Sequence, residues 1–275
     1  MALKDLLVHV AAAPDSGPAI DAALALAEQH DAHLAGLAIR APLDIPVYAE
    51  AHLPESMLQI LQEREDQRIA GARQLFESKA KHAGRGERIA WRVDSGLPFD
   101  ALGLHARYAD LTVLAQDNPE KQDYRFAELA ADLLVASGRP VLVVPSIGAR
   151  TAIGFTVLVA WNGSREAARA LADAMPILEK AQSVEIFIAG DPHIGDLPGA
   201  DIAAHLAHHK IRVEAYRLPG AEAPVGDALL NRAAAIGADL IVMGGYGHSR
   251  LREFVLGGAT RHILQHLTVP VLMSH

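Results

Sequence analysis

The sequence contains no cysteine among its 275 residues. This absence excludes disulfide bonds, thiol catalysis and cysteine-ligated metal sites together. No apolar run approaches the roughly 20 residues that a membrane-spanning helix needs. The N-terminal stretch MALKDLLVHVAAAPDSG is also a poor signal peptide, because Asp5 and His9 interrupt its apolar part. We therefore expect a cytoplasmic protein that does not enter membranes.

An excess of positive charge is missing as well. The formal net charge is −8, so general binding of nucleic acid is not expected. Apolar residues make up 51% of the chain and charged residues 21%, which is typical of a folded globular protein. A chain of 275 residues forms one large domain or two of ordinary size.

Signatures of common enzyme classes are also missing. No lysine follows a glycine-rich turn as in a P-loop, and no Ser-His-Asp order with a nucleophile elbow is visible. His205 and His209 lie one helical turn apart and could share a metal, but no carboxylate stands beside them as in a zinc protease motif, so we interpret them as part of a solvated helix face. Asp191, His193 and Asp196 form a second candidate metal or acid-base cluster, for which an ordinary loop is the alternative.

Short β-rich apolar runs alternate with helix-favouring segments along the whole chain. Strands are expected at residues 6–10, 33–39, 89–93, 111–115, 140–144, 155–161, 183–189, 211–217, 240–243 and 269–273. Helices are expected at residues 19–28, 55–81, 99–107, 126–136, 165–178, 201–210, 226–235 and 250–267. Buried-looking strands separated by helices predict an α/β fold, with a parallel sheet covered by helices on both faces.

The two halves of the chain share local sequence. Residues 109–113 (ADLTV) correspond to residues 238–242 (ADLIV), and the PVL of residues 140–142 recurs at residues 270–272. The spacing between these landmarks is nearly the same in both halves. We therefore interpret the chain as a duplication of a five-stranded α/β unit, with domains at residues 1–147 and 148–275.

The most distinctive segment runs from Leu240 to Thr260 and reads LIVMGGYGHSRLREFVLGGAT. An apolar strand ends there in a glycine-rich turn, and a helix-like segment follows. Glycines let the backbone approach a ligand closely, and the amides at a helix start can face an anion. The segment predicts a nucleotide or phosphate cradle, and a tight turn without ligand is the alternative.

These features together resemble a tandem universal stress protein, with one domain in each half. Nucleotide-binding members of that family carry glycine, two residues, glycine, nine residues, then glycine followed by Ser or Thr. Gly244, Gly247 and Gly257 keep this spacing. The resemblance implies two Rossmann-like domains, of the adenine nucleotide alpha hydrolase-like type. It also implies a stress-response role.

The resemblance implies that the second half binds ATP or a related adenine nucleotide, with Mg²⁺, in a regulatory role with little or no catalysis. The implied contacts are Ala160, Trp161, Asn162, Ala189, Met243, Gly244, Gly247, His248, Gly257, Gly258, Ala259 and Thr260. Two positions depart from the family pattern. Gly258 stands where Ser or Thr is expected, and Asn162 stands where an Asp would bind the ribose. Asn can still bond a hydroxyl, and Thr260 could supply the missing one.

The corresponding segment of the first half departs much further. Residues 116–121 read QDNPEK and contain no glycine. Acidic side chains at a phosphate position repel an anion, and Pro119 removes a backbone donor. We therefore expect no nucleotide in the first half, whose residues 41–81 could instead contact a partner or a different ligand.

Two other functions stay open. In a ligand-free interaction protein the glycines would serve only the turn, which agrees with the departures at Gly258 and Asn162. A nucleotidyl transferase would need a phosphate-binding signature after its first strand, and residues 160–164 (AWNGS) are a poor one. For assembly, the resemblance implies an intramolecular pseudo-dimer of the two halves, packed through residues 140–144 and 269–273. A homodimer of whole chains is a further alternative.

Overall fold

The computed structural model describes residues 2–11, 16–42, 54–117, 129–146, 152–189, 200–218, 224–245 and 258–275. The first half contains β1 (Asp5–His9), α1 (Gly17–His30), β2 (His33–Arg40), α3 (Glu55–His82), β3 (Ile89–Ser95), α4 (Pro98–Ala106), β4 (Leu111–Ala115), α5 (Leu129–Ala136) and β5 (Val141–Val144). The second half contains β6 (Thr156–Ala160), α6 (Arg165–Leu178), β7 (Ser183–Ala189), α7 (Ala200–His208), β8 (Val213–Leu218), α8 (Val225–Ile236), β9 (Leu240–Gly244), α9 (Gly258–Gln265) and β10 (Val271–Ser274).

The predicted alternation of strands and helices is confirmed. Each expected strand is present close to its expected bounds. The last helix was expected from residue 250. Its described part, α9, begins at Gly258, and residues 246–257 lie outside the described ranges.

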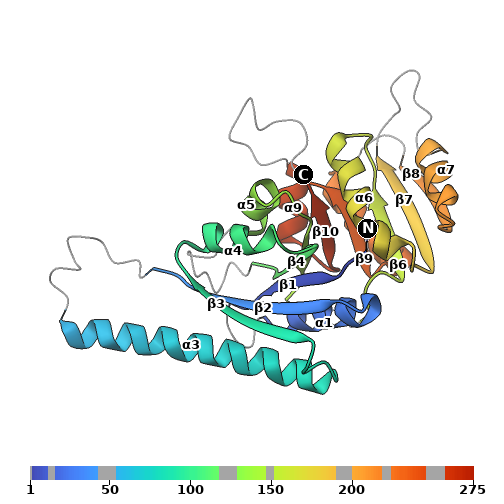
Figure 1. Cartoon of the computed structure of the whole chain (residues 1–275). Helices are drawn as coiled ribbons and strands as arrows, with labels where there is room; N and C mark the ends of the chain where they lie inside the picture. Colours follow the sequence, from blue (N-terminus) through green and yellow to red (C-terminus); the bar gives the residue numbers. More distant parts are fainter. Residues whose placement is uncertain are drawn as a thin grey trace.

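All ten strands belong to one sheet, in the order β3-β2-β1-β4-β5-β10-β9-β6-β7-β8. Neighbours pair in parallel, as in β1 with β2 and β6 with β7, except for β5 and β10, which are antiparallel. Helices cover both faces of this sheet, as predicted (Figure 1). The two expected five-stranded sheets are therefore continuous with each other.

The β5–β10 pair is the contact that was expected between the final strands of the two halves. Leu142 lies opposite Leu272, and each is the second residue of its strand. An antiparallel pair in which equivalent residues meet has the local two-fold symmetry of an isologous interface. The local two-fold axis at this pair relates strands β1 to β5 to strands β6 to β10.

Alternating strand residues feed two apolar layers, as expected for strands that are buried on both faces. One layer lies between the sheet and α1, α3, α6 and α7, and the other between the sheet and α4, α5, α8 and α9. Leu6 and Val8 enter the first layer, whereas Leu7 enters the second. Among the described helices, none is long and apolar enough to span a bilayer.

Helix α3 is where the two halves differ most in shape. It has 28 residues, whereas α7, which takes the same place between the second and third strands, has 9. The N-terminal end of α3 extends past the sheet, and the rest runs along it (Figure 1). Ala72, Phe76 and Ala80 bury the C-terminal part of the helix in the core.

An aspartate before the fourth strand of each half ties two strands together. The Asp239 carboxylate accepts hydrogen bonds from the backbone N–H groups of residues 154–156 at 2.8 to 3.3 Å, at the start of β6. Asp110 accepts from the N–H groups of Lys4 and Asp5 at 2.8 and 3.0 Å, at the start of β1. The repeated Ala-Asp-Leu sequence therefore has a structural role.

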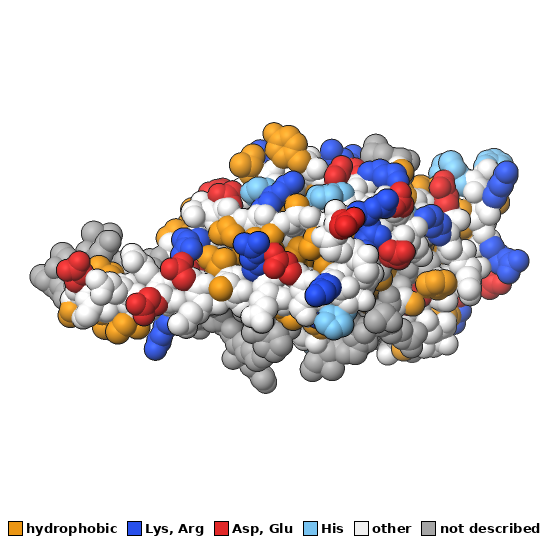
Figure 2. Space-filling model, turned by 60° about the horizontal axis from the view of Figure 1, so that its bottom comes forward, with side chains coloured by type: hydrophobic (Ala, Val, Ile, Leu, Met, Phe, Trp, Pro, Cys, Tyr) orange, Lys and Arg blue, Asp and Glu red, His pale blue; other side chains and the backbone are white. Residues whose placement is uncertain are grey.

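The face that carries α3 has a mixed surface. Figure 2 shows Lys and Arg side chains interspersed with Asp and Glu over this face. Several of them form ion pairs, such as Arg73 with Glu77 and Lys79 with Asp21. Among the side chains coloured there, no continuous basic surface offers itself to a polyanion.

Candidate functional site

The candidate site of the second half lies where β6, β7 and β9 end. The chain runs outward from β6 through β7 to β8 and then returns to β9 on the other side of β6. Open α/β sheets bind ligands at the carboxyl ends of their strands, at such a reversal of strand order. Ala160 ends β6, Ala189 ends β7, and Met243 and Gly244 end β9. The structure thus brings these four predicted residues to one edge.

Gly244 has a packing role that is independent of any ligand. A Cβ on this residue would lie 2.6 Å from the backbone nitrogen of Ala167 and from the carbonyl carbon of Glu166, both in the first turn of α6. Such distances are not found between real atoms, so β9 and α6 can approach this closely only with glycine here. This one glycine of the motif is therefore explained by the fold alone.

The start of α6 is closed by its own side chains. The Ser164 hydroxyl accepts a hydrogen bond from the Ala167 N–H at 3.1 Å, and Asn162 Oδ1 accepts from the Ser164 N–H at 3.1 Å. Glu166 is buried, and a hydrogen bond from its own backbone N–H holds the pKa of its carboxyl below the ordinary value. Because a carboxylate already lies at this positive helix end, a phosphate has little reason to bind there.

Asn162 and Trp161 follow β6 at the same edge. Asn162 is exposed, but its side-chain oxygen is engaged by the Ser164 N–H. A ribose hydroxyl bound here would therefore meet the N–H₂ donors of Asn162, whereas the Asp of the family pattern would accept a bond from it. Trp161 is half-buried and packs against the core.

Helix α9 contributes the remaining described residues of the site. Gly258 and Ala259 are exposed where its described part begins, whereas Thr260 is 5% exposed. Thr260 therefore lies inside the helix layer and is not exposed beside Gly258. A Cβ on Gly258 would meet no atom within 4 Å, so packing does not require glycine at this position. Gly247, His248 and Gly257 lie outside the described residues.

Comparison with known proteins agrees with this geometry. Residues 155–275 match the model of the universal stress protein family. They form a universal stress protein domain. A universal stress protein from Archaeoglobus fulgidus DSM 4304 is 17% identical, with a TM-score of 0.74 over 98% of this chain and 95% of that chain. No curated protein matches the sequence significantly.

A second solved structure is also similar over the whole chain. A protein of unknown function from Pseudomonas aeruginosa PAO1 is 17% identical, with a TM-score of 0.58 over 99% of this chain and 92% of that chain. At this identity the likeness concerns the fold alone. It covers both halves of the chain, including the half that the family model does not match.

The strand registers locate the equivalent edge in the first half. The register of β1 with β2 begins with Asp5 opposite His33, and that of β6 with β7 begins with Thr156 opposite Ser183. Counting along the strands from these pairs, Ala11 corresponds to Asn162 and Ile39 to Ala189. The backbone bonds agree, because Val10 N donates to Leu37 O at 2.8 Å and Trp161 N donates to Phe187 O at 2.9 Å. In the first half a side chain of α3 reaches these two positions. The Arg68 guanidinium donates hydrogen bonds to the carbonyl oxygens of Ala11 and Ile39.

A residue of the first half also contacts α9, the helix next to the candidate phosphate site of the second half. Gln116 N donates to Val144 O as Gly245 N donates to Ser274 O, so Gln116 takes the place of a glycine of the second half. Its Nε2 donates to the carbonyl oxygens of Leu264 and Gln265, both at 3.1 Å. The segment that was expected to repel phosphate therefore begins with a residue that caps the C-terminal end of α9.

The other candidate sites gain little from the structure. His205 and His209 are exposed with ring centroids 5.0 Å apart, and the described residues hold no group of three His, Asp or Glu that could bind a metal. Asp191, His193 and Asp196 lie outside the described residues.

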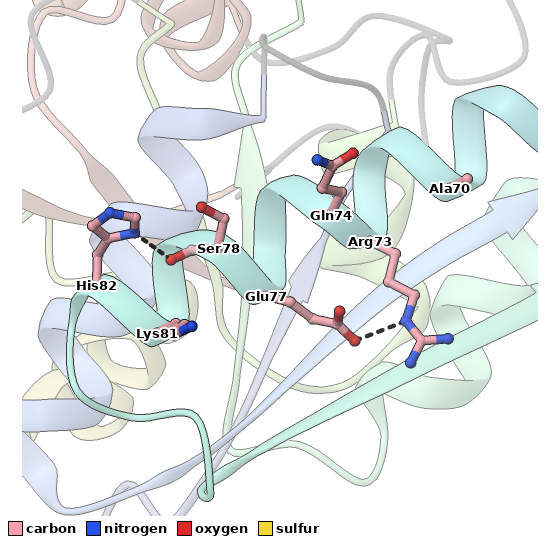
Figure 3. A pocket seen from close by; sticks show the side chains of 7 residues that line it. All are labelled: Ala70, Arg73, Gln74, Glu77, Ser78, Lys81 and His82. Atoms are coloured by element: carbon pink, nitrogen blue, oxygen red, sulfur yellow. Dashed lines mark hydrogen bonds and ion pairs between the residues drawn. The ribbon is translucent and has the colours of Figure 1, made fainter.

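A surface hollow of about 730 Å³ lies along α3 (Figure 3). Two of its polar groups are already bonded within the helix. Arg73 pairs with Glu77 at 2.7 Å, and His82 Nδ1 lies 2.7 Å from Ser78 O. These contacts favour a solvated helix face over a ligand site.

Proposed function

We propose that the universal stress protein domain at residues 155–275 binds ATP or a related adenine nucleotide. The carrying observation is that Ala160, Ala189 and Met243 meet at one carboxyl edge, next to the spacing Gly244-x₂-Gly247-x₉-Gly257. The adenosine part would lie at the ends of β6 and β7. The phosphates, with Mg²⁺ accompanying them, would lie at the glycine segment and the start of α9.

The contrast between two helix starts supports this orientation. The start of α6 holds Ser164 and Glu166 as internal partners, whereas Gly258 and Ala259, the first described residues of α9, are exposed. A helix start with exposed amides favours an anion. In this orientation adenosine would lie at the ends of β6 and β7, and the phosphates would lie next to α9.

We further propose that the role is regulatory rather than catalytic. The described residues offer no carboxylate or histidine cluster that could hold a catalytic metal. Nucleotide binding would instead act on the position of α9, which Gln116 of the other half contacts. Any hydrolysis of ATP would be slow.

We also propose that residues 1–147 are a degenerate domain of the same kind and residues 148–275 the functional one. The equivalent registers, the paired aspartates and the symmetric β5–β10 contact support a duplication. The two units would form an intramolecular pseudo-dimer. Because the pseudo-dimer already joins the two final strands, a homodimer of chains would need another surface.

The position of Gly258 gives the sharpest test. Gly258→Ser restores the hydroxyl of the family pattern at a position where a Cβ meets no atom within 4 Å. We expect calorimetric titration with ATP to show binding to the unaltered protein and about tenfold tighter binding to Gly258→Ser, equivalent to about 1.4 kcal/mol. Gly258→Ala is the matched control, since it adds the carbon without the hydroxyl, and should bind as the unaltered protein does.

A ligand-free interaction protein is the second candidate function. The observation that favours it is Gly244, which the packing against α6 explains without a ligand. If neither ATP, ADP nor AMP binds to the unaltered protein or to Gly258→Ser, this second function replaces the first. A bulky residue at Gly247 that abolishes nucleotide binding but leaves the fold intact would support the first.

A further inference from the structure

The ligand edge of the first half contains a largely buried ion pair from α3, between buried Glu65 and half-buried Arg68. The Arg68 Nε donates to Glu65 Oε2 at 3.0 Å, and Nη2 donates to Glu65 Oε1 at 2.7 Å. The two side chains are only 15% and 8% exposed. A guanidinium and a carboxylate that meet through two parallel bonds form one of the strongest pairs in proteins.

The Arg68 guanidinium also bonds backbone groups at the ends of two strands. It donates to the carbonyl oxygen of Ala11, which follows β1. It also donates to the carbonyl oxygen of Ile39 in β2 at 2.6 Å. These are the positions that correspond to Asn162 and Ala189 in the second half. Arg68 therefore lies where the ligand of an α/β sheet would contact the first two strands.

The described groups to which Arg68 is bonded are hydrogen-bond acceptors. Two backbone carbonyls and a carboxylate suit a planar cation with several N–H donors and do not suit an anion. His9 ends β1 beside this site, and burial, with a smaller contribution from the Arg68 charge, lowers its pKa to about 4. His9 is therefore neutral near pH 7 and adds no second positive charge.

We propose that the ligand position of the first half has become a guanidinium site, which Arg68 fills from within the chain. A nucleoside in that position would need the space of the Arg68 side chain. This proposal does not depend on nucleotide binding by the second half.

The surface offers a path to this site. A hollow of about 320 Å³ lies at the carboxyl ends of β2 and β3, and its walls include Glu65, Gln62, Arg40 and Ser95. Glu65 thus contacts both the buried guanidinium and the hollow. A small cation from solvent could reach the carboxylate once the Arg68 side chain is removed.

Chemical rescue tests the proposal directly. Arg68→Ala should lower the thermal unfolding midpoint by several degrees, because it removes the guanidinium that makes two hydrogen bonds to the buried Glu65 carboxylate. Guanidinium chloride on the order of 10 mM, far below unfolding concentrations, should raise that midpoint by about 3 °C if it binds with a Kd of about 1 mM. Methylammonium chloride at the same concentration should have a smaller effect, because it cannot bridge the acceptors.

Two controls make the result decisive. Arg73→Ala removes an arginine of the same helix that is 59% exposed and pairs with Glu77, and guanidinium should not raise its midpoint. The double variant Glu65→Gln, Arg68→Ala removes the carboxylate and should lose most of the rescue. If Arg68→Ala does not fold, Arg68→Lys keeps the charge, loses the planar fork and should show partial rescue. Equal shifts in all variants and in the unaltered protein would overturn the proposal.

Discussion

Ala115 and Gly244 hold equivalent places at the ends of β4 and β9, and Ala11 and Asn162 hold equivalent places after β1 and β6. In the second half Gly244 packs directly against α6 at the carboxyl edge of the strands, and small or polar residues line this edge. In the first half Arg68 of α3 lies across the same edge. The strand framework is common to both halves, so the described differences between the two edges lie in a few side chains and in helix α3.

The largest expected effect concerns the close contact that only the second half requires. Gly244→Ala places a Cβ 2.6 Å from backbone atoms of α6, which cannot move away as a flexible side chain can. We expect a loss of about 3 kcal/mol in the free energy of unfolding, measured with urea. The matched change in the first half, Ala115→Gly, should cost only about 1 kcal/mol. Similar small losses in both variants would show that the two edges are packed alike.

The next effect concerns acid, to which we expect the first half to be more sensitive. His9 stands where the second half has Ala160, and burial followed by the Arg68 charge lowers its pKa from 6.5 to about 4. Below pH 6.5 the unfolded chain takes up a proton at this residue that the folded chain does not. Stability therefore falls as the pH decreases from about 6.5 to about 4, by about 2 kcal/mol at pH 5.

Urea unfolding at pH 7 and pH 5 measures this difference. His9→Gln should reduce the pH dependence by about the same 2 kcal/mol, whatever it does to the stability at pH 7. His33→Gln is the control, because His33 is exposed. A slope that His9→Gln leaves unchanged would assign the acid sensitivity to other groups, of which His30, also with a pKa lowered to about 4 by burial, would be the first to examine.

Local patterns were sufficient to predict the fold. Apolar runs bounded by turn residues predicted the strands, and the repeated ADL and PVL sequences predicted a duplication. The contact of β5 with β10 was implied by the family resemblance, as were the site residues Ala160, Ala189 and Met243. The glycine spacing pointed to the helix whose described part begins at Gly258.

The contacts that distinguish the halves were not predictable from spacing, because they join distant parts of the chain. Arg68 bonds a carbonyl 57 residues away, and Gln116 bonds one 148 residues away. One signal was present in the sequence. Glu65 and Arg68 share a helix face with Ile69, Ala72 and Phe76, and charged residues on a buried face are rarely without partners. The partner itself becomes visible only when the strands are in place.

The smallest expected effect asks whether the first half supports the second. Gln116 Nε2 donates to two carbonyls at the C-terminal end of α9, where the helix dipole is negative. Gln116→Glu has nearly the same shape but replaces both donors with a negative charge. We expect a loss of about 1 kcal/mol in stability, faster hydrogen exchange in residues 258–265, and several-fold weaker ATP binding. Gln116→Lys keeps a donor and a favourable charge, so its ATP affinity should stay close to that of the unaltered protein.

The outcomes of this last experiment separate two relations between the halves. The counterpart of Gln116 is Gly245, which has no side chain, and a Cβ there would lie 2.2 Å from the end of Leu134 in α5. Gly245 therefore gives α5 no polar contact like the one that Gln116 gives α9, and the second half instead reaches the chain after α5 through Arg169, which donates to Gly138 O at 3.4 Å. Faster exchange in α9 with unchanged ATP affinity would mean that Gln116 holds the helix without helping the ligand. Faster exchange together with weaker binding would make the first half a structural part of the nucleotide site that we propose in the second half.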